Sequence, residues 1–217
     1  MSLLTTFDET DKNAFFQKYT VCAEETTLEA IWEAKTTNAT ELSIYRRNVS
    51  DLSPLKDLRH LQELDVSTTQ VSDLSPLKDL VHLRVLDLAC TQVHDLSPLK
   101  ELFHLEQLNI EGTQVTDLSP LKDLHHLQSL LVGSTQVSDL SPLKDLHHLN
   151  ALDLSFTQVC DLSPLKTIIE KGIVVQWAKL NWESLAIDIG NTPLSNPPIA
   201  IAKQGNAAIL SHWEEKL

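Results

Sequence analysis

The sequence contains few cysteines, glycines and aromatic residues. Its three cysteines, Cys22, Cys90 and Cys160, are scattered and odd in number, and none belongs to a C-x-x-C pair. This pattern argues against a disulfide framework or a zinc site and indicates free thiols in a reducing compartment. Aromatic residues make up 5% of the chain and glycine occurs five times, so we expect a core built mainly from aliphatic side chains.

Long apolar runs and an excess of basic residues are also missing. No run approaches the roughly 18–20 apolar residues of a membrane span. The N-terminus, MSLLTTFDETDK, has neither the basic start nor the apolar stretch of a signal peptide. The formal charge of −13 argues against nucleic acid and anionic membranes as partners. We therefore expect a cytoplasmic protein, and a basic protein is the partner that this charge favours.

An internal repeat is the strongest feature that the sequence does contain. The segment VSDLSPLKDLRHLQELDVSTTQ starts at Val49, and a near-copy starts at Val71. The difference, 71 − 49, gives a 22-residue period, which continues at Val93, Val115, Val137 and Val159. Each unit carries the pattern L-x-x-L-x-(L/V/I)-x-x-T-x-V, whose length and spacing are those of leucine-rich repeats.

Each repeat predicts one strand and one helical return. In LQELDVS the apolar residues alternate, so Leu64 and Val66 face one side of a strand and Asp65 faces the other. In DLSPLKDL we expect a short 3₁₀ or helical turn, with Ser53 as its cap and Pro54 at its first position. The predicted fold class is α/β, a right-handed leucine-rich-repeat solenoid. Its parallel sheet lies on the concave face and its helical turns on the convex face.

The 22-residue unit and its DLSPL return resemble the internalin-type class of bacterial leucine-rich repeats. Internalins are secreted adhesins, and the resemblance implies the fold alone. The chain departs from the pattern where threonine replaces the usual asparagine, at Thr69, Thr91, Thr113, Thr135 and Thr157. We expect the threonine hydroxyl to satisfy backbone groups of the turn, with fewer hydrogen bonds than an amide.

The two ends of the chain lack the repeat and predict caps that cover the solenoid core. Residues 1–38 form the predicted helical N-terminal cap, in which Leu28, Ile31 and Trp32 make an apolar stripe. The repeats occupy residues 39–166. Residues 167–217 are expected to supply terminal strands at 172–176 and 185–189, a helix broken at Gly205 and a final helix. Trp177 and Trp182 are expected to seal the core.

The tail NTPLSNPPIAIAKQGNAAIL is similar to the segment that ends the repeats in bacterial Roco-type proteins. The matching residues are Pro193, Leu194, Pro197, Pro198, Gln204, Gly205, Ala208, Ile209 and Leu210. The resemblance implies a GTPase domain after the repeats, yet the chain has no G-x-x-x-x-G-K-[ST] phosphate loop. One alternative is therefore a structural repeat domain of a larger GTPase-like protein, with Leu210, Trp213 and Leu217 docking the absent domain.

Two polar columns recur at the repeat period. The aspartates are expected to accept hydrogen bonds from turn amides two residues on, and they are Asp51, Asp73, Asp95, Asp117, Asp139 and Asp161. The histidines should stack just before each strand, and they are His60, His82, His104, His126 and His148, with His125 and His147 beside two of them. A metal or pH sensor is a second alternative. We favour a polar turn position, because no cysteine or carboxylate completes a ligand set.

No catalytic motif is present, since G-x-S-x-G, H-E-x-x-H and glycine-rich loops are all missing from the sequence. No cofactor or metal is predicted. Outward strand positions differ between repeats while core positions hardly vary, which favours a protein-binding surface on the concave face. The predicted function is a non-enzymatic protein-interaction module in bacterial signalling. Its candidate binding residues are Tyr45, Arg46, Glu63, Asp65, Val85, Asp87, Asn109, Glu111, Leu131, Asp153 and Phe156.

Overall fold

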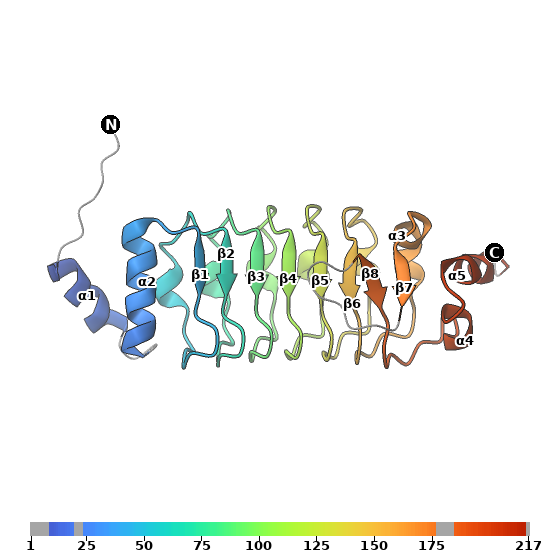
Figure 1. Ribbon diagram of the computed structural model, residues 1–217, viewed down its shortest axis with the longest axis horizontal. Coiled ribbons are helices and arrows are strands. Elements are labelled where there is room, and N and C mark those ends of the chain that lie inside the picture. The colour runs from blue at the N-terminus through green and yellow to red at the C-terminus, as the bar shows by residue number, and fades with distance from the viewer. Residues whose placement is uncertain (1–8, 20–23, 177–184, 216–217) are drawn as a thin grey trace, which may run out of the picture.

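The computed structural model describes residues 9–19, 24–176 and 185–215, and it confirms the leucine-rich-repeat solenoid. One parallel sheet runs the length of the molecule, with helices at both ends (Figure 1). Its strands are β1 (Glu41–Ser43), β2 (Glu63–Asp65), β3 (Val85–Asp87), β4 (Gln107–Asn109), β5 (Ser129–Leu131), β6 (Ala151–Asp153), β7 (Val174–Gln176) and β8 (Ala186–Asp188). The helices are α1 (Glu9–Tyr19), α2 (Glu25–Thr37), α3 (Lys166–Glu170), α4 (Ile199–Ala202) and α5 (Asn206–Glu214).

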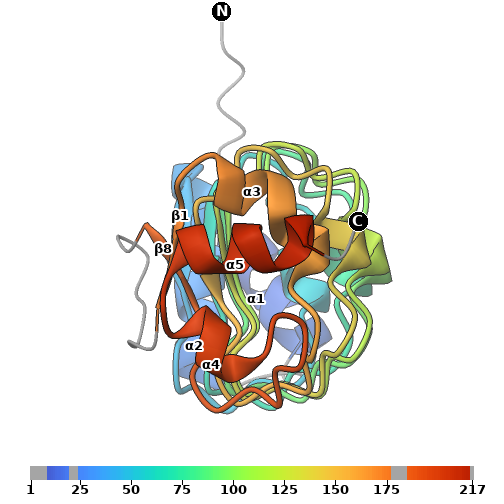
Figure 2. The same ribbon diagram turned by 90° about the vertical axis from the view of Figure 1, so that its right-hand side faces the viewer.

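The core lies between the sheet and the returning turns. Figure 2 views the solenoid end on, with strands along one side and the 3₁₀ turns along the opposite side. Neighbouring strands pair one repeat apart, so that Leu64 stands beside Leu86, and Leu86 beside Leu108. These leucines are buried, and burying one leucine side chain contributes about 2 kcal/mol. No helix among those described has the length and apolarity needed to cross a bilayer.

Each repeat returns through one 3₁₀ turn, and these turns are Ser53–Leu55, Ser75–Leu77, Ser97–Leu99, Ser119–Leu121, Ser141–Leu143 and Ser163–Leu165. The predicted role of the aspartate column is confirmed, because Asp51 Oδ1 accepts the Ser53 N–H at 2.7 Å and the other five repeats do the same at 2.8 Å. The prediction that Ser53 caps the turn was wrong, because Leu52 precedes the helix and no side chain caps it. Ser53 is the first helical residue and Pro54 the second. The Ser53 backbone N–H donates to the Asp51 carboxylate.

The threonine column behaves as expected. The Thr69 hydroxyl donates to the Val66 carbonyl oxygen at 2.7 Å, and the four later repeats form the same bond at 2.6–2.7 Å. Thr192 makes an equivalent bond to the Ile189 carbonyl oxygen at 2.8 Å. This last bond lies beyond residue 166, so the segment around β8 forms one more rung of the solenoid.

The C-terminal strands do not follow chain order. Both predicted terminal strands are confirmed, yet β8 pairs with β6 while β7 lies outside β8 at the edge of the sheet. The chain therefore passes outward through α3 and β7 before it returns to complete the rung. Trp177 and Trp182, which were expected to seal the core, lie outside the described residues.

Helices cover both ends of the core, as predicted. In α2, Leu28 and Ile31 are buried and Trp32 packs partly against the core. At the other end, α4 and α5 lie across the solenoid (Figure 2). Trp213 of α5 is buried, and its indole N–H donates to Asn196 Oδ1 at 3.0 Å. Because Trp213 packs into the core of this chain, it is not free to dock a further domain. Leu217 lies outside the described residues.

The outer edge of the sheet is covered by one side chain of α5. Asn206 Oδ1 accepts the Val175 N–H at 3.1 Å, and Asn206 Nδ2 donates to the Ile173 carbonyl oxygen at 2.7 Å. The amide therefore makes the two bonds that a further strand would make with β7. An edge strand with free N–H and C=O groups would invite pairing with another chain.

We predict that Asn206→Ala lowers the free energy of unfolding by about 1–3 kcal/mol, because it leaves a part-buried donor and acceptor without partners. Urea unfolding measures the change, and size-exclusion chromatography reports any pairing of the exposed edge. Gln204→Ala is the matched control, since its amide donates to the Ala200 carbonyl oxygen at an exposed position. Equal stability of the two variants would contradict the role given to Asn206.

Candidate functional site

The register of the sheet arranges its outward side chains in two columns. The first contains Glu41, Glu63, Val85, Gln107, Ser129, Ala151 and Ala186, and the second contains Ser43, Asp65, Asp87, Asn109, Leu131, Asp153 and Asp188. Side chains on β1 to β3 are exposed or half-buried, whereas both outward positions of β5, β6 and β8 are buried. From β1 to β6, the open part of this face therefore lies at the N-terminal end, while Val174 of β7 is exposed again at the opposite edge of the sheet.

Three candidate binding residues are not accessible. Asn109, Leu131 and Asp153 are 7%, 5% and 2% exposed, so the prediction that they form a free surface was wrong. Side chains one rung apart pack against each other, and Asn109 Nδ2 donates to Asp87 Oδ2 at 3.2 Å. A Cβ atom on Gly133 would stand 3.0 Å from Asp153 Oδ2, so the missing side chain makes room for this carboxylate.

The second column, which is rich in aspartate, also has a structural role that the sequence analysis did not predict. Asp65 Oδ1 accepts the Ser67 N–H at 2.9 Å, and the same bond two residues on is formed by Asp87, Asn109, Asp153 and Asp188 at 2.8–2.9 Å. The spacing is that of the return aspartates, so the signal was present in the sequence. Asn109 shows that an amide forms this turn bond without a charge.

Phe156 does not lie on a strand. It was predicted on the concave face, but it lies in the turn after β6, at the position that Thr68, Cys90, Gly112 and Ser134 occupy in earlier repeats with φ between 56° and 68°. Such left-handed backbone suits glycine and disfavours bulky side chains. Phe156 has a φ of 56° and is 60% exposed, so the fold tolerates it there at a cost.

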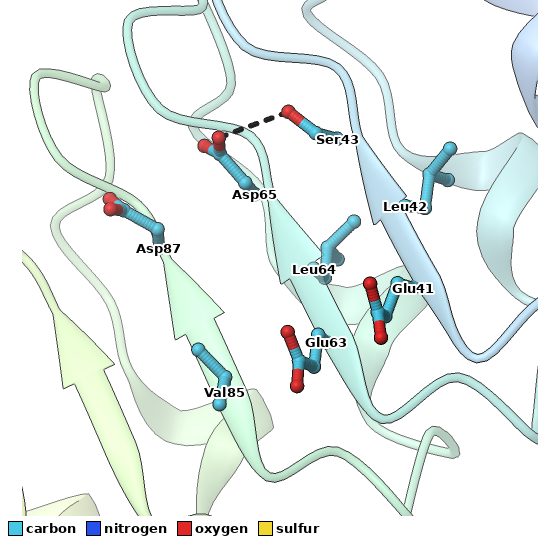
Figure 3. A pocket seen from close by; sticks show the side chains of 8 residues that line it. All are labelled: Glu41, Leu42, Ser43, Glu63, Leu64, Asp65, Val85 and Asp87. Carbon is cyan, nitrogen blue, oxygen red and sulfur yellow. Dashed lines mark hydrogen bonds between the residues drawn. The ribbon is translucent and has the colours of Figure 1, made fainter.

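An acidic hollow of about 480 Å³ opens on β1 to β3. Figure 3 shows the side chains that line it, which are Glu41, Leu42, Ser43, Glu63, Leu64, Asp65, Val85 and Asp87. The Ser43 hydroxyl donates to Asp65 Oδ2 at 3.0 Å, and no lysine or arginine is among these lining residues. Four carboxylates from three neighbouring rungs therefore surround one open space.

Tyr45 and Arg46 follow β1 at the N-terminal end of this face. Both are exposed, and the Arg46 guanidinium lies 5.2 Å from the centre of the Tyr45 ring. The ring holds the cation by a cation–π contact, which leaves the guanidinium N–H groups at the surface. The pair combines two of the three residue types that are enriched at the energetic centres of protein interfaces.

Burial changes the acidity of the second column. Desolvation raises the pKa of Asp87 above its ordinary value of 3.8, and the nearby carboxylates of Asp65 and Glu111 raise it further. Hydrogen bonds from the Ala89 amide and Asn109 lower the pKa but do not cancel this rise. Burial likewise raises the pKa of Asp188. In the return turns the opposite holds, since hydrogen bonds from Ser97 lower the pKa of Asp95. The charged form of Asp87 is thus disfavoured by its surroundings.

The histidine column is confirmed as a stack for His82, His104 and His126. Ring centres lie 6.5 Å apart for His82 and His104, and 6.2 Å apart for His104 and His126. Within the described parts of the chain, no group of three or more histidine, cysteine, aspartate or glutamate side chains is arranged to hold a metal ion.

We predict that Asp87→Asn raises the free energy of unfolding at neutral pH. The raised pKa means that the folded state binds the proton more tightly than the unfolded state, so ionised Asp87 destabilises the fold. The gain should shrink as the pH falls through the raised pKa toward 3.8, because wild-type Asp87 then protonates. Urea unfolding from about pH 3 to about pH 7 tests this. Asp95→Asn should change stability slightly in the opposite direction, because its lowered pKa favours the ionised form.

We predict that Phe156→Asn raises the free energy of unfolding by about 1 kcal/mol, because asparagine tolerates left-handed backbone better than phenylalanine. The next turn provides the matched reverse variant, since Asn191 also has a φ of 56°. Asn191→Phe should lower stability by a similar amount in the same urea experiment. Loss of stability in Phe156→Asn would mean that the exposed ring makes a stabilising contact.

Comparison with known proteins agrees with this geometry. A family model described as leucine-rich repeats, in two copies, matches residues 103–145. No curated protein matches the chain. Among solved structures, internalin C2 of Listeria monocytogenes is 32% identical with a TM-score of 0.54, over 64% of this chain and 70% of that one.

Two more distant structures show the same fold. A second internalin of Listeria monocytogenes, internalin F, is 24% identical with a TM-score of 0.51, over 74% of this chain and 53% of that one. A leucine-rich-repeat protein of Leptospira interrogans is 22% identical with a TM-score of 0.55, over 66% of this chain and 35% of that one. The repeat, its register and these likenesses agree, and the chain belongs to the leucine-rich-repeat proteins of the bacterial internalin type.

Proposed function

We propose that this chain is a non-enzymatic protein-interaction module that binds a basic segment of another protein in the acidic hollow. The leucine-rich-repeat fold is in general a protein-interaction module, and its members are typically non-enzymatic scaffolds. The observation that carries the proposal is the open space of about 480 Å³ between Glu41, Glu63, Asp65 and Asp87. A lysine or arginine side chain would find carboxylates there from three rungs.

The carboxylates of the hollow repel one another. Glu41 is paired in register with Glu63, and Asp65 with Asp87, so like charges stand directly beside each other on neighbouring strands. Such pairs destabilise a sheet. The fold does not require them, because Gln107 occupies the Glu63 position two repeats later and Asn109 the Asp65 position. A bound cation would offset the repulsion, which supports a basic partner.

The rim of the hollow supplies the other features of a binding surface. Val85 gives it an apolar, half-buried wall, and the exposed Tyr45 and Arg46 follow the lining residue Ser43 by two and three positions in the chain. Glu111 is half-buried farther along the face. We therefore place the interface on Tyr45, Arg46, Glu63, Asp65, Val85 and Asp87, and add Glu41. The buried Asn109, Leu131 and Asp153 then support the face from within the stack.

The proposal extends to a recognition or regulatory role in a bacterial signalling system and to a cytoplasmic location. The cysteines support this location, because Cys90 and Cys160 are both exposed free thiols. Exposed thiols persist most readily in a reducing compartment.

The test compares two variants that each lose four negative charges. The first is Glu41→Gln, Glu63→Gln, Asp65→Asn and Asp87→Asn, in which the amides keep the turn bonds as Asn109 does. The control is Asp73→Asn, Asp95→Asn, Asp117→Asn and Asp139→Asn, in the return turns. Tagged protein captures partners from lysate of the source organism, and a carbodiimide then joins contacting carboxylates to partner lysines for identification by mass spectrometry.

We expect the first variant to lose its partner by at least about tenfold, because each lost ion pair in a hollow weakens binding. The control should capture it normally, and cross-links should map to the four carboxylates of the hollow. Equal capture by both variants would refute the proposed site. So would cross-links that map only to other surfaces of the chain.

A further inference from the structure

A second hollow lies on the edge of the solenoid where the strands begin. It has a volume of about 420 Å³ and is lined by Gln62, His82, Arg84, His104, Glu106 and His126. We call it the edge hollow. Its three exposed imidazoles stand one per repeat, with ring planes inclined by 18° and 25° to their neighbours. They form a ladder that runs along the long axis of the molecule.

Unlike the acidic hollow, the edge hollow is not lined by an excess of carboxylates. It combines one guanidinium and three imidazoles with a single carboxylate, in a chain whose formal charge is −13. Glu106 Oε1 accepts from Arg84 Nε at 2.9 Å and from Arg84 Nη2 at 2.6 Å. A neutral imidazole keeps one N–H donor and a protonated one has two. The lining therefore offers hydrogen-bond donors to carboxylates.

Two apolar side chains directly precede the ladder residues in the chain. Val81 and Phe103 are 43% and 51% exposed. The later repeats place His125 and His147 at the same position, so the fold does not require an apolar residue there. Adjacent exposed apolar side chains mark interaction surfaces more often than a single one does.

We propose that the edge hollow is a second binding surface, which takes an extended acidic peptide of a protein partner. In an extended chain, side chains on the same side repeat about every 6.6 Å. The imidazoles of the ladder repeat at 6.2–6.5 Å, so alternate carboxylates of one peptide would each meet one ring. Arg84 would bind a further carboxylate, and Val81 and Phe103 would contact apolar groups of the peptide.

The probe is a fluorescein-labelled peptide in which glutamate alternates with threonine, and fluorescence anisotropy at low salt measures its affinity. A peptide of the same composition with its glutamates consecutive tests the spacing. The variant His82→Gln, His104→Gln and His126→Gln removes the ladder. The matched control, His94→Gln, His125→Gln and His147→Gln, removes three exposed histidines outside the edge hollow.

We expect the alternating peptide to bind the unmodified protein and the control alike, and to bind the ladder variant at least about tenfold more weakly. The consecutive peptide should bind more weakly than the alternating one. Glu106→Gln should tighten binding about threefold, because it frees Arg84 for the peptide. This gain does not depend on a damaged fold, and urea unfolding verifies that all variants remain folded.

Three outcomes would overturn the proposal. The first is no binding of the alternating peptide to the unmodified protein. The second is equal affinity of the ladder variant and its control. The third is tighter binding of a single-stranded oligothymidylate of the same charge, which would assign the ladder to nucleic acid.

Discussion

The structure depends on parallel strand pairing in which each strand lies exactly one repeat from the next. This register stacks Leu64 on Leu86 and Leu86 on Leu108, so one continuous aliphatic core forms from units that could not bury their leucines alone. It also forces every outward position into a column, whatever residue occupies it. The need for caps follows from the same constraint. At the C-terminal end, the Asn206 side-chain amide caps the edge of the sheet, because it makes two hydrogen bonds that a further strand would otherwise make.

Most polar columns serve the turns between these strands. Aspartates in the return turns, and aspartate or asparagine at the ends of most strands, accept an N–H two residues on. Threonine hydroxyls donate to backbone carbonyl oxygens three residues earlier. The fold therefore explains most of the repeated aspartates, and function must be sought in features that these turn bonds do not explain. Two places stand out, the acidic hollow on β1 to β3 and the edge hollow along the imidazole ladder. Their different linings, carboxylates in one and imidazoles with a guanidinium in the other, would let one partner present a basic and an acidic segment to the same molecule.

Much of the architecture was predictable because the repeat is nearly regular. The 22-residue period predicted the strands, the 3₁₀ returns and the buried leucines, and the spacing of Asp51 and Ser53 predicted their hydrogen bond. The candidate site was predicted less well. The identity of each column followed from the period, but the burial of Leu131 and Asp153 depends on packing between rungs and at the C-terminal end. The exposed Tyr45, Arg46 and Glu63 were correctly expected at the surface.

The sequence by itself determined the solenoid, its register and the chemical identity of every column, because these follow from a local pattern repeated at a constant interval. Tertiary structure decided which members of a column face solvent and which lie buried. It also decided that β8 pairs with β6 ahead of β7, and that Phe156 occupies a left-handed turn. These outcomes arise from contacts between rungs and from the path of the C-terminal segment, where the repeat no longer specifies the neighbour of each strand.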